Sequence, residues 1–213
     1  MHVKKELSFD PLYHNHPHSQ DASQIIHDMK EVYVDTVDDL PPNDPKRRGK
    51  SVQIDCFTDV DHGGDKVTRQ LQTGIIVFGN LAPLIWYWKR QNTVGSSTVG
   101  AEFVVLRIAM EMITSFQYKL QMFAIPLDGP AIFFSDNEAV YRHAAVVKSK
   151  LKQKHNSIFF HLVREAVATG KMLFFKVDAK EKLADLLTKL VPGHRWKYLR
   201  LKIMFTKEED KVS

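Results

Sequence analysis

Four acidic residues stand where carboxylates from separate elements of the chain could meet. Asp59 and Asp136 follow apolar, strand-like runs, whereas Glu102 and Asp185 lie in helical patterns. Carboxylates that converge on one point repel one another unless a cation lies between them. Hard divalent ions such as Mg²⁺ bind such oxygen clusters, usually together with phosphate oxygens. These four residues therefore predict metal-dependent phosphodiester chemistry.

The elements that must position these residues follow from hydrophobic periodicity. Strand-like runs cover residues 51–58, 74–78, 84–88, 131–135 and 171–177, and helical patterns cover residues 98–123, 137–147, 158–166 and 183–189. Three strands joined by short loops, followed by alternating helices and strands, predict an α/β fold whose mixed sheet has an antiparallel edge. Such sheets carry their sites at the carboxyl ends of the strands. If the strands before Asp59 and Asp136 are neighbours, the two carboxylates lie close together.

Composition limits the class of protein. A chain of 213 residues with 44% hydrophobic residues can bury one good core, so we expect one domain plus tails. The net charge of +5 permits a polyanionic partner but is equally common among other enzymes. The single cysteine, Cys56, excludes a disulfide framework and a Cys-rich zinc site, and we expect it to be a small buried side chain.

No apolar stretch approaches the length of about 18 residues that a membrane span needs, and the N-terminus lacks a signal-peptide core. These features predict an intracellular protein with no membrane association, and they leave cytoplasm and nucleus as open alternatives.

Three regions divide the chain. Residues 1–50 are polar and end in a Pro- and charge-rich segment, so we expect a largely irregular connector. Residues 51–192 have globular patterning, and residues 193–213 form a basic tail that we expect to be partly helical. Within the domain, Trp86 and Trp88 could stack on a base or sugar, although we expect Trp86 to pack in the core beside Leu84.

Seven short motifs in this order resemble the ribonuclease H domain of copia-type retrotransposon Gag-Pol polyproteins, and the resemblance runs from about residue 49 to residue 192. The motifs are residues 57–61, 86–94, 97–103, 135–137, 154–156, 161–165 and 183–189. Singly each is weak, but in this order and at these separations they are specific. The resemblance implies a ribonuclease H-like fold with a mixed five-stranded sheet and flanking helices.

The resemblance also implies an activity and a set of roles. Asp59, Glu102, Asp136 and Asp185 match the family's catalytic carboxylates, which hold two Mg²⁺ ions, with Mn²⁺ as a possible substitute, and cut the RNA strand of an RNA–DNA hybrid. One ion activates water and the other stabilises the leaving oxygen. Selection of RNA needs a contact to the 2′-hydroxyl group, which Asn137 could supply. In a full element, the domain would be covalently linked to reverse transcriptase and integrase.

A basic stretch follows the helical pattern after Asn137. Lys148, Lys150, Lys152 and Lys154 alternate along the chain, as expected for a loop that follows a phosphate backbone, although a solvated loop explains them equally well. His155 could assist proton transfer or product release.

Simpler explanations remain for single residues and for the whole chain. Glu102 could lie on a solvated helix face, and Asp136 could cap the next helix. Trp88 stands where relatives have Ser, and residues 115–122 lack the arginines of the family. These departures would weaken hybrid binding, so a catalytically inactive retroelement remnant with residual nucleic-acid binding is an alternative. A nuclease or transposase of the same fold that acts on DNA is another.

Overall fold

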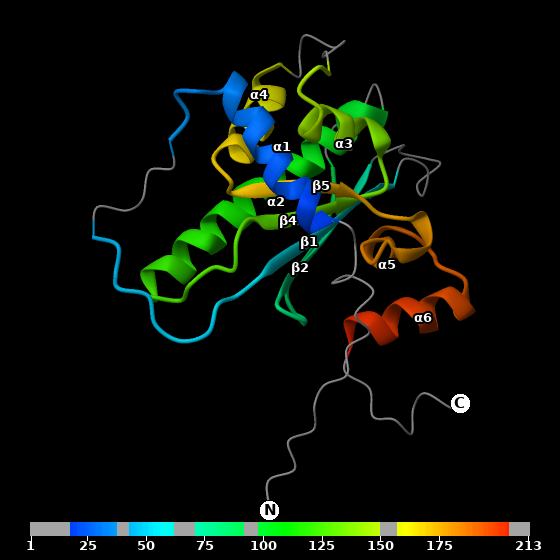
Figure 1. Cartoon of the computed structure of the whole chain (residues 1–213). Helices are drawn as coiled ribbons and strands as arrows, with labels where there is room; N and C mark the ends of the chain where they lie inside the picture. Colours follow the sequence, from blue (N-terminus) through cyan, green and yellow to red (C-terminus); the bar gives the residue numbers. More distant parts are fainter. Residues whose placement is uncertain (1–17, 38–42, 62–70, 92–97, 150–156, 205–213) are drawn as a thin grey trace, which may run out of the picture.

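A five-stranded sheet forms the centre of the protein (Figure 1). The computed structural model describes residues 18–37, 43–61, 71–91, 98–149 and 157–204. The strands are β1 (Ile54–Asp61), β2 (Gln72–Gly79), β3 (Ala82–Arg90), β4 (Ala131–Ser135) and β5 (Met172–Lys176), in the order β3-β2-β1-β4-β5. Strands β1, β2 and β3 pair antiparallel, whereas β4 pairs parallel with both β1 and β5. This confirms the predicted mixed five-stranded sheet with an antiparallel edge.

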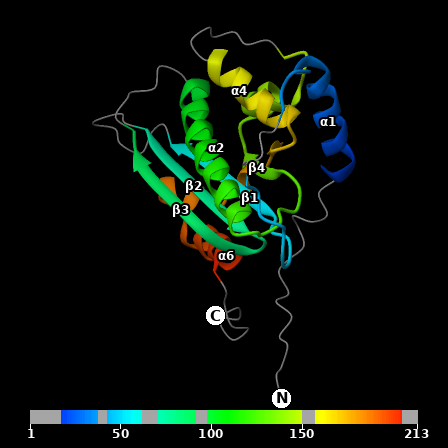
Figure 2. The same ribbon diagram turned by 90° about the vertical axis from the view of Figure 1, so that its left-hand side faces the viewer.

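Helices cover both faces of the sheet. They are α1 (His18–Val32), α2 (Thr98–Met122), α3 (Glu138–Ala145), α4 (Ser157–Ala168), α5 (Asp185–Thr188) and α6 (Gly193–Ile203), with a short 3₁₀ turn, η3 (Ala179–Glu181), before α5. Figure 2 shows α2 lying across β1, β2 and β3, with α6 behind the sheet. No helix among the described residues is long and apolar enough to cross a membrane.

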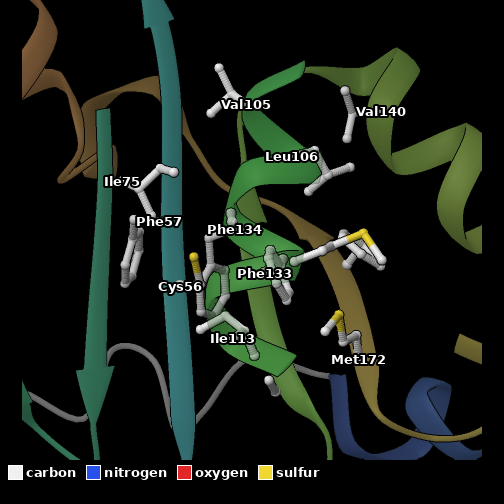
Figure 3. Close-up of a cluster of buried hydrophobic side chains, with 14 of the residues drawn as sticks. Cys56, Phe57, Ile75, Val105, Leu106, Ile113, Phe133, Phe134, Val140 and Met172 are labelled. Carbon is white, nitrogen blue, oxygen red and sulfur yellow. The ribbon is translucent and has the colours of Figure 1, made fainter. Parts of the chain in front are cut away.

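The core lies between the sheet and α2 (Figure 3). The rings of Phe57 and Phe134, on neighbouring strands, stack with their centroids 4.8 Å apart. Cys56 is fully buried, as expected, and burial raises the pKa of its thiol. The central strands are buried along both faces, which explains why their sequences are continuous apolar runs rather than alternating ones.

Helix α1 differs from the irregular connector that we expected for residues 1–50. Met29 is completely buried and Ile25 and Ile26 pack against the core, so this helix has one apolar face, which contacts α4. The Tyr33 hydroxyl group also forms a hydrogen bond with His161 Nδ1 of α4, at 2.7 Å. A partner 128 residues away in sequence stabilises this segment, and local composition does not reveal such a partner.

Strand β3 corrects the expectation for Trp86. Leu84, Trp86 and Trp88 alternate with half-buried residues along this edge strand, and Trp86 is 71% exposed. The indole of Trp88 donates a hydrogen bond to Gln72 Oε1 at 3.3 Å. The prediction that Trp86 packs in the core was wrong because Ile85, rather than Trp86, points toward α2.

Candidate active site

Neighbouring parallel strands bring Asp59 and Asp136 together. In the pairing of β1 with β4, Phe57 lies opposite Phe134, so two further residues along each strand bring the two aspartates level. Asp59 lies within β1, which continues to Asp61, whereas Asp136 directly follows β4. The Lys182 ammonium group contacts both carboxylates and lies 2.6 Å from Asp136 Oδ1.

Gly74 allows α5 to approach this pair. It lies opposite Asp59 in the pairing of β1 with β2. A Cβ atom at Gly74 would lie 2.7 Å from Thr188 Cγ2 and 3.0 Å from the Ala184 carbonyl oxygen, both closer than ordinary van der Waals contact. Because Gly74 has no side chain, α5 packs closely enough for the Thr188 hydroxyl group to donate a hydrogen bond to Asp59.

Asp185, the first residue of α5, is held by two cations. Lys189 Nζ lies 2.9 Å from Asp185 Oδ1 and 3.3 Å from the Asp59 carboxylate. Arg195 Nη2, from α6, lies 2.5 Å from Asp185 Oδ2. Lys189 therefore links the carboxylates of β1 and α5, and Arg195 ties α6 to the same cluster.

Glu102 points from α2 into the site and is only 6% exposed, so it does not lie on a solvated helix face. Burial raises its pKa to about 7. The negative charges of Asp59 and Asp136 act in the same direction, whereas Lys182 and a hydrogen bond with Asn137 oppose them. All four predicted carboxylates therefore share one electrostatic environment.

The helix cap after β4 is Asn137 rather than Asp136. Asn137 Oδ1 accepts hydrogen bonds from the backbone N–H groups of Ala139, at 2.9 Å, and Val140, at 3.4 Å. Because Asn137 caps α3, the Asp136 carboxylate is available to Lys182.

The buried charges stabilise one another. Burial acts to raise the pKa of Asp59, but Lys182, Thr188 and Lys189 outweigh it and the pKa is lowered. Burial likewise acts to lower the pKa of Lys182, yet Asp59 and Asp136 raise it above its ordinary value. At Asp185 burial has the larger effect and raises the pKa, although Lys189 opposes it. Lys182 is therefore a charged ammonium group in the folded protein.

The cluster has the donor chemistry of a divalent-cation site, since every candidate ligand is a carboxylate oxygen. The positions between the carboxylates are nevertheless taken by side-chain cations. No group of three or more acidic, histidine or cysteine side chains in the described ranges is arranged to hold a metal ion. Sequence reasoning missed Lys182, Thr188, Lys189 and Arg195; the one local signal was Lys189, four residues after Asp185 on a helical pattern.

The expected nucleic-acid contacts fall only partly within the described residues. Lys148 is exposed, whereas Lys150, Lys152, Lys154 and His155 lie outside the described ranges.

Arg164, on α4, holds the segment that carries Lys148. Its guanidinium group donates hydrogen bonds to the carbonyl oxygens of His143, at 3.0 Å, Val146, at 2.7 Å, and Ser149, at 3.1 Å. It also lies over the Phe160 ring, 4.1 Å from the centroid.

Comparison with known proteins gives matches to longer polyproteins. The chain is 30% identical over 146 residues to the retrovirus-related Pol polyprotein from transposon RE1 of Arabidopsis thaliana, covering 67% of this chain and 10% of that protein. The Pol polyprotein from transposon TNT 1-94 of Nicotiana tabacum is 26% identical over 147 residues, covering 66% of this chain and 10% of that protein. The chain thus spans about one tenth of the length of these relatives. No protein-family model matches it.

Among solved structures, LC11-RNase H1 in complex with RNA/DNA hybrid is 18% identical, with a TM-score of 0.49, over 64% of this chain and 94% of that chain. The strand order β3-β2-β1-β4-β5 and the pairing register define the fold of this chain.

Proposed function

We propose that this chain, which is homologous to a segment of the Pol polyproteins of copia-type transposons, hydrolyses the RNA strand of RNA–DNA hybrids as a ribonuclease H domain. The observation that carries the proposal is the convergence of Asp59, Glu102, Asp136 and Asp185 from β1, α2, the end of β4 and α5. Four carboxylates from four elements at one end of the central strands are costly to bury, and metal-dependent phosphodiester cleavage is a function that requires them.

In this proposal, the four carboxylates would hold two Mg²⁺ ions, with Mn²⁺ as a substitute. The ions would activate the attacking water and stabilise the charge that develops on the leaving oxygen. The chain would orient the ligands: the Thr188 hydroxyl group holds Asp59, and the Arg195 guanidinium group holds Asp185. Buried Glu102 would contribute its carboxylate to the ligand set from α2.

Substrate binding is proposed to use the rim of the site. Asn137 lies next to Asp136 and interacts with Glu102, so its amide can reach a 2′-hydroxyl group presented to the carboxylates. Exposed Lys148 would contact the phosphate backbone, and Lys150, Lys152, Lys154 and His155 remain predicted contributors from the adjoining segment. In a full element, the chain would act while linked to reverse transcriptase and integrase.

One observation favours the alternative of an inactive remnant that retains only nucleic-acid binding. Lys182 lies between Asp59 and Asp136, where a catalytic cation would be needed. An ammonium group held this tightly competes with a divalent ion for the two carboxylates. If the ammonium group always excludes the ion, the chain would fold but would not cleave its substrate.

Cleavage of a strand-labelled RNA–DNA hybrid by the purified chain tests the proposal. We expect cutting of the RNA strand with Mg²⁺, no cutting with EDTA, and no cutting by Asp136→Asn. Asp128→Asn is a matched control because Asp128 is an exposed aspartate outside the cluster, and it should cleave normally. A folded wild-type chain that cuts nothing would favour the remnant, and cutting of duplex DNA instead would favour a DNA nuclease of the same fold.

A further inference from the structure

We infer that Lys182 is a built-in counter-cation of the acidic cluster, so that a divalent ion can bind Asp59 and Asp136 only by displacing its ammonium group. The inference rests on the proposed role of these carboxylates as metal ligands. It assigns to Lys182 the control of metal affinity, a role that the proposed nuclease mechanism does not include.

The contacts of Lys182 carry the inference. Its side chain is only 3% exposed, and its ammonium group contacts Asp59, which is completely buried, and Asp136, which is 30% exposed. Lysine is strongly hydrated and is almost never this buried unless it is paired. A point charge between two carboxylates from adjacent parallel strands does what a hard cation would do there: it neutralises their repulsion and supplies a bond to each.

The charge balance of the cluster supports the same conclusion. Three aspartates, Asp59, Asp136 and Asp185, face three permanent cations, Lys182, Lys189 and Arg195. With these six groups charged, their charges cancel, and only the carboxyl group of Glu102 remains without a matching cation to attract a divalent ion. The lack of a preformed three-ligand group in the described ranges agrees with this balance.

Helix α6 holds the segment that directly precedes Lys182. Arg195 donates a hydrogen bond to the Ala179 carbonyl oxygen at 2.6 Å, and Tyr198 and Lys202 both contact the Glu181 carboxylate. Because this segment is tied down, displacement would involve rotation of the lysine side chain about its four-carbon stem rather than movement of the loop.

Mn²⁺ titration of the full chain, followed by electron paramagnetic resonance, tests the inference without relying on catalysis. We expect Lys182→Gln to bind Mn²⁺ at least about tenfold more tightly than the wild type, since it keeps a polar side chain but removes the competing charge. Lys180→Gln makes the same charge change at an exposed position two residues away and should bind like the wild type. Equal affinities for the wild type and Lys182→Gln would overturn the inference.

Lys182→Arg separates competition by charge from a general disturbance of the site. It keeps a cation and should bind Mn²⁺ about as weakly as the wild type, so tight binding by this variant would count against the inference. If Lys182→Gln does not fold in EDTA, thermal unfolding decides the question. Mn²⁺ should then restore a cooperative transition for Lys182→Gln while changing the wild-type midpoint much less, and failure of Mn²⁺ to restore folding would overturn the inference.

Hybrid cleavage by the same variants distinguishes the two proposals. If Lys182→Gln binds Mn²⁺ more tightly but neither the wild type nor any variant cleaves the hybrid, the counter-cation role is supported and the nuclease function is refuted. Wild-type cleavage together with unchanged Mn²⁺ affinity in Lys182→Gln supports the nuclease and refutes the counter-cation role.

Discussion

The substitution Gly74→Ala should disturb the site, although glycine has no functional group of its own. The new Cβ atom would lie 2.7 Å from Thr188 Cγ2, about 0.7 Å short of the 3.4 Å at which ordinary contact begins, and 3.0 Å from the backbone oxygen of Ala184. A backbone atom cannot rotate away, so α5 must shift from the sheet. Overpacking of this kind costs about 1–3 kcal/mol. The shift would also draw the Thr188 hydroxyl group away from completely buried Asp59.

Urea unfolding followed by tryptophan fluorescence measures this effect. We expect Gly74→Ala to lose about 2 kcal/mol of unfolding free energy. If the proposed function is correct, hybrid cleavage should fall about tenfold or more, because small displacements of catalytic groups are costly. Gly193→Ala is the matched control: it begins α6, and a Cβ atom there meets nothing within 4 Å. Unchanged stability and cleavage in Gly74→Ala would refute the role of close packing between α5 and β2.

Two further substitutions test the electrostatics and the segment before the basic stretch. Burial raises the pKa of Glu102 from 4.5 to about 7, so the folded wild type holds a proton that the unfolded chain releases, and its stability in EDTA should fall as pH rises through this window. Between pH 4 and pH 8, the unfolding free energy of Glu102→Gln should therefore increase by up to about 3 kcal/mol relative to that of the wild type, as measured by urea unfolding. A difference between the two proteins that does not change with pH would contradict the raised pKa of Glu102. Arg164→Lys should lose about 2–4 kcal/mol, since one ammonium group cannot replace the hydrogen bonds to three carbonyl oxygens or the stacking on Phe160. A loss below about 1 kcal/mol would show that these contacts contribute little.

Local pattern was sufficient to predict the five strands and the helices from α2 to α5, but it did not predict α1. The apolar runs before Asp59 and Asp136 have the length and composition of buried strands, and their buried faces in β1 and β4 agree with that prediction. Periodicity reports burial because each element must turn one face to the core. It could not report that β3 is an edge strand, and Trp86 was misplaced for that reason.

The sequence by itself determined which carboxylates are available, since Asp59, Glu102, Asp136 and Asp185 were singled out by their positions on the predicted elements. Only the tertiary structure decided what neutralises them. Lys182 lies 46 residues from Asp136 in sequence, and no local signal pairs them. The physical reason is that periodicity is a local property, which records only whether a side chain faces the core. An ion pair depends instead on which segments, distant in sequence, pack together, and here α5 and α6 pack against the end of the sheet.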